Sequence, residues 1–228
     1  AGSAYKTMCA ELFEEKARKP GKPFRIVYLT NVGGSYNMLG ETLRLTREVL
    51  LEVSDFRREN CPLSALTLGV KCGTSDATSG IAGNPCVGAA FDQLIRAGGT
   101  AFFSETTEII GAEDLVAKRA VNESVAKKIL SAAKHWEDKA KATGEDIRKI
   151  NPIPANIAAG ISSLEEKSLG AIAKSGTSPI QDVLKYAEMP KGSGLYFVDS
   201  WMSSLSLPLC LTACGATIML YQMAVSYT

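Results

Sequence analysis

Apolar residues in this chain gather in short continuous runs, and amphipathic segments with helical spacing lie between these runs. Short apolar runs bounded by turn residues indicate buried strands, whereas apolar residues three and four positions apart indicate helices with one buried face. The expected strands are residues 24–30, 62–70, 100–104, 195–198 and 216–220. The expected helices are residues 4–19, 38–58, 86–97, 112–120, 122–143, 162–173, 179–186 and 205–214. Because the two kinds of element alternate, we expect an α/β fold with a mostly parallel, Rossmann-like, doubly wound sheet and helices on both faces.

The segment 71–85 lies between a predicted strand and a predicted helix and is rich in small and hydroxyl residues. Glycines gather where the backbone turns tightly or approaches a ligand closely. In open α/β sheets, ligands lie at the turns that follow the carboxyl ends of strands. We therefore expect this segment to form the floor of an active site, with Asn84 as the N-cap and Pro85 as the first residue of the next helix.

Polar residues also follow the other predicted strands, in the segments 31–35, 105–113 and 199–204. The turns at one edge of a doubly wound sheet lie near one another, so their side chains should converge. The side chains expected there are Lys71, Cys72, Ser75, Asp76, Glu105, Glu108, Glu113 and Asp199. Such a set suits a divalent metal with oxygen ligands, or removal of a proton next to a carboxylate. Backbone N–H groups of residues 73–80 could hold a substrate carboxylate.

Each candidate also has a structural interpretation. Asp76 could stabilise its own turn through backbone N–H groups, and Cys72 could be a small buried apolar residue. The glutamates at 105, 108 and 113 cannot all be catalytic, and at least one suits a helix N-terminus. Lys167 could be a surface charge of its helix.

Composition excludes several classes of protein. The net charge of +1 gives no basic surface for nucleic acid. The six cysteines include no Cys-x-x-Cys pair, so we expect reduced thiols and a cytoplasmic protein. His135 is the only histidine and falls on a charged helix, which argues against a Ser-His-Asp triad. The apolar stretch 205–225 is interrupted by polar residues, so we expect a buried helix and strand there and no membrane span; Cys210 and Cys214 should pack in the core.

Three ordered motifs carry a resemblance to a known family. Residues 68–85 read LGVKCGTSDATSGIAGNP, and residues 98–113 read GGTAFFSETTEIIGAE. The third block has Asn151-Pro152, then NIAAGISSLEEKSLG over residues 156–170, followed by Lys174 and Gly176. These motifs resemble the altronate/galactarate dehydratase family, which includes the large subunit of sulfolactate sulfo-lyase. The resemblance is to the C-terminal catalytic part, so we expect residues 1–228 to be a single catalytic-type domain and a fragment of a longer protein.

The resemblance implies a metal-assisted β-elimination from a hydroxylated acid, assisted by iron(II) or manganese, that yields a 2-keto acid. We expect Asp76 and Glu108 to act as acid/base or metal groups, and Lys71 or Lys167 to stabilise the enolate. Cys72 and Glu105 are the expected metal ligands. The expected substrate-binding residues are Gly73, Ser75, Ser79, Asn84 and Asn156.

Alternatives remain open at this stage. Lys71 stands where sugar-acid dehydratases more often have glutamate, which brings the chain closer to the sulfo-lyase branch. The sequence departs from the family after Asp199, where Ser200-Trp201 replaces Thr-Pro, and this favours a non-catalytic binding or assembly domain. The hypothesis of a nucleotide-binding oxidoreductase rests only on Gly33-Gly34, because the Gly-x-Gly-x-x-Gly fingerprint is absent. As partners we expect a small hydroxy acid, a second copy of the chain in a homo-oligomer and a small β-rich domain or subunit.

Overall fold

The computed structural model describes residues 2–224, with side chains described from residue 9 onward. The chain divides into two compact units, residues 1–60 and residues 61–228.

The first unit is helical, with α1 (Gly2–Arg18), α2 (Leu29–Val32) and α3 (Ser35–Ser54). The strand predicted for residues 24–30 is wrong, because residues 22–28 have no regular structure and α2 begins at Leu29. A strand needs a hydrogen-bonded neighbour, and every strand in the described residues belongs to the second unit. Gly33-Gly34 therefore does not follow a strand, and the nucleotide-binding turn that it suggested lacks its first element.

The second unit contains a five-stranded sheet in the order β3-β4-β2-β1-β5. Its strands are β1 (Thr67–Cys72), β2 (Thr100–Phe103), β3 (Ile180–Leu184), β4 (Gly194–Val198) and β5 (Ile218–Gln222). Each pair of neighbours runs parallel. The α/β prediction is confirmed.

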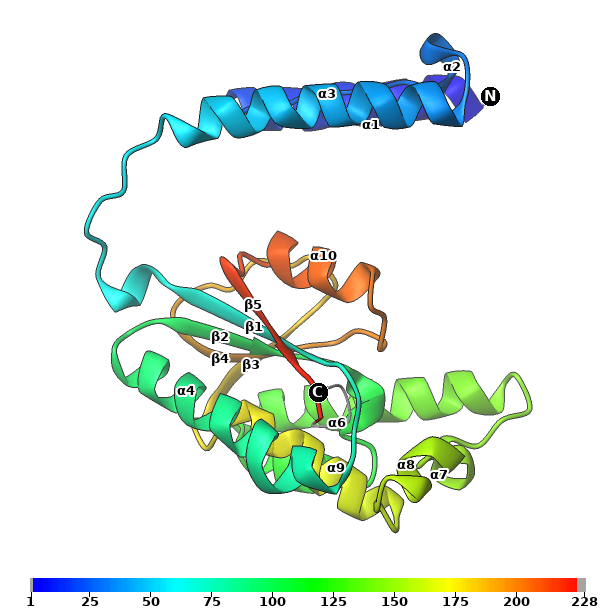
Figure 1. Cartoon of the computed structure of the whole chain (residues 1–228). Helices are drawn as coiled ribbons and strands as arrows, with labels where there is room; N and C mark the ends of the chain where they lie inside the picture. The colour runs from blue at the N-terminus through cyan, green and yellow to red at the C-terminus, as the bar shows by residue number, and fades with distance from the viewer. Residues whose placement is uncertain (1, 225–228) are drawn as a thin grey trace. The chain divides into compact units, whose positions relative to one another are not determined.

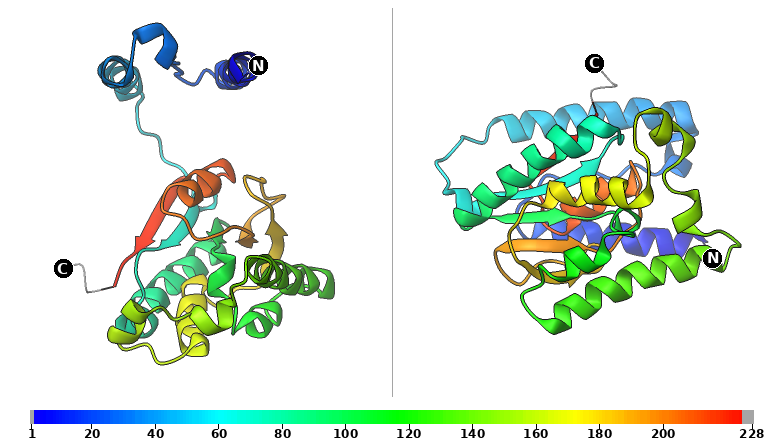
Figure 2. Two further views of the ribbon diagram at one scale, coloured as in Figure 1. Left: turned by 90° about the vertical axis from the view of Figure 1, so that its right-hand side faces the viewer. Right: turned by 90° about the horizontal axis from the view of Figure 1, so that it is seen from below.

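Helices cover both faces of this sheet, as the doubly wound prediction requires (Figure 1). One face carries α4 (Asn84–Arg96), α5 (Glu113–Ala117), α6 (Glu123–Lys141) and α9 (Leu164–Ile172), of which α4, α6 and α9 lie across it in the view from below (Figure 2, right). The opposite face carries α10 (Ser206–Ala213). The short helices α7 (Ile147–Ile150) and α8 (Pro154–Ala158) lie in the connection between α6 and α9.

Neighbouring residues of each central strand face opposite sides of the sheet. Phe103 and Phe197 belong to the core formed with α4 and α6, whereas Phe102 and Tyr196 pack with α10. This alternation follows from the two-residue period of a strand, and burial on both faces explains why β2 and β4 are mostly apolar.

The chain leaves β2 toward the face covered by α6, and it leaves the adjacent β4 toward α10. Such a switch between neighbouring strands is where open α/β sheets bind ligands. Here the two strand ends are joined, since Ser104 Oγ donates to Val198 O (2.7 Å) and Thr106 N donates to Ser200 O (2.9 Å).

Two local predictions are wrong. Residues 179–186 are not a helix: Ile180–Leu184 forms β3, whose buried Ile180 and Leu184 pair with β4. Asn84 is not an N-cap, because a π-helical turn at Ser79–Gly83 runs directly into α4 and makes Asn84 an interior residue. In the part of the chain that the structure describes, no helix is both long enough and apolar enough to cross a membrane.

Candidate active site

Four charged side chains are buried together at the carboxyl ends of β1 and β2. We call this group the buried charge cluster; its members are Lys71, Glu105, Glu108 and Lys174. Lys71 belongs to β1, the glutamates lie in the turn after β2, and Lys174 lies in the 3-10 turn after α9. None is more than 3% exposed. Groups with such high desolvation costs are retained only where they pair with one another.

Glu105 is the centre of the buried charge cluster. Its Oε2 accepts hydrogen bonds from Cys72 N (2.9 Å) and Lys174 Nζ (2.9 Å), and its Oε1 lies 3.8 Å from Lys71 Nζ. The backbone of Glu105 has a φ of 69°, in the left-handed region that residues with a Cβ rarely adopt. Such an outlier at a strand end indicates a functional position.

Lys174 joins the two glutamates, because its ammonium also donates to Glu108 Oε2. Burial would lower the pKa of Lys174, but the Glu108 and Glu105 carboxylates outweigh it and raise that pKa. Burial would raise the pKa of Glu108, but the Lys174 ammonium lowers it on balance. For Glu105, burial prevails over Lys174 and its pKa is raised. Lys174 and Glu108 are therefore a charged pair inside the protein.

The Cys72 thiol lies against this cluster. Burial, together with the nearby Glu108 carboxylate, raises the pKa of Cys72 to about 12. The thiol is therefore protonated at neutral pH, and its Sγ lies 3.4 Å from Ser75 Oγ. Within the described residues, no three His, Cys, Asp or Glu side chains are placed to share a metal ion. With Lys174 bound to both carboxylates, Cys72 and Glu105 do not fit the metal site that we predicted from the sequence.

Lys167 lies next to the cluster and is not a surface charge. Its Nζ donates to Asn151 Oδ1 (2.7 Å) and Asn156 Oδ1 (3.0 Å), and the side chain is buried. Burial lowers the pKa of Lys167, and the attraction of Glu108 only partly offsets this. Asn156 in turn donates to Ser75 O (3.0 Å), so α8 connects Lys167 to the segment after β1.

Asp76 and Ser79 stabilise their own turn. Asp76 Oδ1 accepts hydrogen bonds from Ser79 N (2.9 Å), Thr78 Oγ1 (2.6 Å) and Ser79 Oγ (3.2 Å). Burial would raise the pKa of Asp76, but these hydrogen bonds lower it on balance. The structural interpretation of Asp76 therefore accounts for its contacts.

Gly73 is needed for packing. Its N–H donates to Gln222 O (2.7 Å), and an added Cβ would lie 2.7 Å from Met223 Cγ and 2.9 Å from Tyr221 Cε1. The glycine therefore lets β5 pass close to the end of β1. Its N–H is already used in this pairing, and a role of Gly73 in substrate binding stays a prediction.

A cavity of about 30 Å³ lies between the 75–80 turn and α9, which is room for one water molecule. Its walls include Ser75, Asp76, Ser79, Asn84 and Lys167. Asn84 Nδ2 donates to Gly170 O (2.8 Å), whereas Asn84 Oδ1 has no partner among the described residues. Four of the five predicted substrate-binding residues are thus brought together around Lys167: Ser75, Ser79, Asn84 and Asn156.

Two predicted acids lie outside the cluster. Glu113 pairs with Arg148 (2.5 Å), and its Oε2 accepts the N–H of Gly111. Asp199 accepts hydrogen bonds from Thr106 Oγ1 (2.7 Å) and Trp136 Nε1 (2.9 Å). Both contact sets are structural, and neither includes a member of the buried charge cluster.

The remaining sulfur and imidazole groups lie elsewhere. Cys210 and Cys214 are buried in the core between α10 and the sheet, which confirms the predicted packing role. His135 lies on α6 and lines a different cavity, described below.

Sequence reasoning did not assign roles to Lys174 and Asn151. Both fall in the third sequence block, but neither follows a strand, and the argument from strand ends therefore passed over them. The only available signal was their place in that block.

A model of a known protein family matches most of the second unit. The model of the family "D-galactarate/Altronate dehydratase, C-terminal" matches residues 63–223, so the chain belongs to this family. The match covers the second unit and all five of its strands. The family that the sequence motifs suggested is confirmed.

Three characterised relatives show the same relationship. The chain is 38% identical over 188 residues to galactarate dehydratase (L-threo-forming) of Escherichia coli (82% of this chain, 36% of the relative). It is 40% identical over 177 residues to altronate dehydratase of Bacillus subtilis (78% and 35%). It is 36% identical over 204 residues to (2R)-sulfolactate sulfo-lyase subunit beta of Chromohalobacter salexigens (88% and 51%). The chain thus spans between a third and half the length of these relatives, which are lyases by name.

Proposed function

We propose that this chain is the catalytic part of a hydro-lyase that removes water from a sugar acid such as altronate or galactarate and leaves a 2-keto-3-deoxy acid. Membership of the family and the names of two relatives support the reaction class. The observation that carries the proposal is a charge imbalance. Lys71 and Lys174 are balanced by Glu105 and Glu108, whereas the neighbouring Lys167 ammonium has only amide partners. A substrate carboxylate would supply the missing negative charge.

The same residues suit the proton transfers of an elimination. In this proposal the Glu108 carboxylate takes the proton α to the substrate carboxylate, and its Oε1 has no hydrogen-bond partner among the described residues. The lowered pKa of Glu108 keeps it ionised, as a base must be. The lowered pKa of Lys167 makes its ammonium a better acid, so it protonates the departing hydroxide. Water leaves from the β carbon, and the enol becomes the keto acid.

The site must open for this to happen. The cavity beside Lys167 holds one water molecule, and a sugar acid is several times larger. Asn156, which belongs to α8, accepts a hydrogen bond from Lys167 Nζ. We therefore propose that α8 moves away from Lys167 when the substrate binds.

The test is release of 2-keto acid by the complete protein with galactarate, altronate and sulfolactate. Glu108→Gln should lower kcat by at least about 100-fold, the usual range for a lost acid or base. Lys167→Gln should do the same, whereas Lys167→Arg should keep substrate binding and lose proton donation. Lys134→Gln is the matched control, because Lys134 is an exposed lysine of α6. Absence of product from all three acids, with binding seen by calorimetry, would instead support the non-catalytic binding domain.

A sulfo-lyase is the second candidate. The match to the sulfo-lyase subunit covers 88% of this chain. Lys71 also stands where sugar-acid dehydratases more often have glutamate, which favours the sulfo-lyase branch. Release of sulfite from sulfolactate, without dehydration of the sugar acids, would favour it.

The predicted iron(II) or manganese ion remains a prediction for the complete protein, and no step above passes through a metal. Cys72, Glu105 and Glu108 do not fit a divalent cation while Lys174 occupies the space between the carboxylates. Metal analysis of the purified complete protein tests the prediction directly.

The expected homo-oligomer, β-rich partner and cytoplasmic location also remain predictions. Light scattering of the complete protein measures its oligomeric state, and cell fractionation tests its location.

A further inference from the structure

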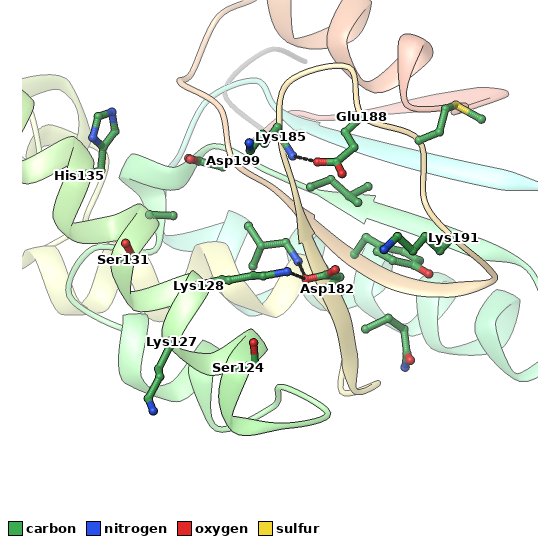
Figure 3. A pocket seen from close by; sticks show the side chains of 16 residues that line it. Ser124, Lys127, Lys128, Ser131, His135, Asp182, Lys185, Glu188, Lys191 and Asp199 are labelled. Carbon is green, nitrogen blue, oxygen red and sulfur yellow. Dashed lines mark hydrogen bonds and ion pairs between the residues drawn. The ribbon is translucent and has the colours of Figure 1, made fainter.

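A second cavity, of about 900 Å³, lies between α6 and β3, and the proposed elimination does not use it (Figure 3). Its walls come from α6, from β3 and from the turn that follows β3. Small-molecule sites in proteins have volumes of about 300–1,000 Å³, so this cavity has the size of a binding site.

The edge of β3 is not open to another strand. Val183 N donates to Asp182 Oδ1 (2.8 Å), and Lys185 N donates to Glu188 Oε2 (2.8 Å). An added peptide strand would need these edge amides as its hydrogen-bond donors. A small molecule fits the cavity better than a peptide strand does.

The acids that line the cavity are already engaged. Asp182 Oδ1 also accepts from Lys128 Nζ (2.6 Å), which reaches across from α6 (Figure 3). Asp199 accepts from Thr106 and Trp136. Their carboxylates are therefore neutralised or held by protein donors.

The lysines that line the cavity differ in their partners. Lys128 pairs with Asp182, and Lys127 pairs with Glu123. By contrast, the ammonium groups of Lys185 and Lys191 form no ion pair with any residue that the structure describes. Both lysines are exposed at the cavity wall. The cavity thus has two lysines without an ion pair among the described residues, Asp182 neutralised by Lys128, and the carboxylates of Asp199 and Glu188 held by neutral donors.

We propose that this cavity binds a small organic molecule that carries a phosphate group. A phosphate ester has a charge of about −1.5 to −2 at pH 7, which matches two ammonium groups better than a single carboxylate does. The apolar side chains of Val183, Leu184 and Met189 also line the cavity and give the organic part a surface to pack against.

The protein has an internal reporter for this site. Its two tryptophans are Trp136 and Trp201, whose ring centroids lie 6.0 Å apart. Trp136 Nε1 donates to Asp199, which lines the cavity, and Trp201 stacks on Tyr186 next to Lys185. Tryptophan emission should therefore respond to a ligand in this cavity.

The experiment titrates the full chain with ribose 5-phosphate, inorganic phosphate, tartrate and ribose, followed by tryptophan emission and by calorimetry. Ribose 5-phosphate should bind saturably and ribose should not. Lys185→Gln/Lys191→Gln should weaken binding by at least about tenfold, because two charges are lost from exposed positions that the fold does not need. Lys134→Gln is the matched control and should leave the affinity unchanged, because Lys134 is an exposed lysine of α6 that does not line the cavity.

Four results would overturn the proposal. One is the absence of both heat and a spectral change with ribose 5-phosphate at millimolar concentrations. Another is equal binding by the double variant, and a third is equal affinity for inorganic phosphate, which would leave the apolar wall without a role. Tighter binding of tartrate would assign the site to a carboxylate instead.

Discussion

Replacing Lys174 with methionine tests the buried charge cluster most directly. Lys174→Met keeps the length and apolar stem of the side chain and removes the ammonium that contacts Glu105 and Glu108. Both carboxylates then remain buried, with Lys71 at 3.8 Å from Glu105 as the nearest remaining cation of the cluster. Removing one partner of a buried pair costs about 3–5 kcal/mol, since the other charge is left uncompensated.

Urea unfolding measures this loss. With a slope of about 2 kcal/mol per molar urea for a unit of this size, 3–5 kcal/mol corresponds to a midpoint shift of roughly 1.5–2.5 M. Tryptophan emission follows the right unit, because Trp136 and Trp201 both belong to residues 61–228. The control Lys134→Met removes an exposed charge of α6 and should leave the midpoint in place.

The shift should depend on pH. In the natural protein the lowered pKa of Glu108 stabilises the fold above the unfolded value of 4.5, and this contribution is lost as the pH falls through the folded pKa. In Lys174→Met the buried carboxylates have raised pKa values and become neutral at mildly acidic pH. The difference between the two proteins should therefore be largest at neutral pH and shrink toward pH 4.5.

A double variant separates the charge effect from simple damage to packing. Lys174→Met/Glu108→Gln removes one charge of each sign and should be more stable than Lys174→Met at pH 7. A midpoint shift below about 0.5 M that is the same at every pH would refute the reasoning, because less than roughly 1 kcal/mol is the range of exposed pairs.

Two further substitutions test the support of the site. Gly88→Ala should destabilise the second unit by about 1–3 kcal/mol, since the new Cβ would lie 2.2 Å from Ala173 O and overpack α4 against the turn that carries Lys174. In contrast, Gly40→Ala on α3 meets nothing within 4 Å and should stabilise its helix by about 0.5–1 kcal/mol; chemical unfolding of both variants checks the opposite signs. Asp92→Ala should cost about 1–3 kcal/mol, because the N–H and hydroxyl groups of residues 177–178 lose the buried carboxylate that accepts their hydrogen bonds. Hydrogen bonds from these residues lower the pKa of Asp92 against the effect of burial, so its contribution should begin to decline below the unfolded value of 3.8 and be lost as the pH falls through the folded pKa; thermal unfolding at pH 3 and pH 7 tests that direction.

The sheet could be predicted where burial alone decides the structure. Residues 101–103 and 195–198 have only aliphatic or aromatic side chains, because both faces of these strands are covered. β3 could not be recognised in this way, since Gln181 and Asp182 make it polar and only its pairing with β4 holds it extended. The error for residues 24–30 was the opposite one. This apolar run was predicted as a strand, but no described strand pairs with it.

The sequence predicted where the candidate site lies, but it predicted only some of the contacts between the residues of the site. The strand-end argument placed Lys71, Cys72, Glu105 and Glu108 together, and all four meet there. It could not show that a lysine about 70 residues further along the chain neutralises both glutamates, because a sequence pattern does not reveal contacts between segments so far apart.

The backbone of Glu105 gives the reason why this turn carries a glutamate. Glycine is the residue that suits a φ of 69°, and a residue with a Cβ loses about 1–2 kcal/mol there. The Glu105 carboxylate joins the end of β1, through Cys72 N, to Lys174 in the turn after α9. Breaking a buried pair of this kind costs about 3–5 kcal/mol, which exceeds the backbone strain. The left-handed turn thus persists because it places a carboxylate where the strand end and the lysine both need one, and Glu108, three residues later, is held against the same ammonium.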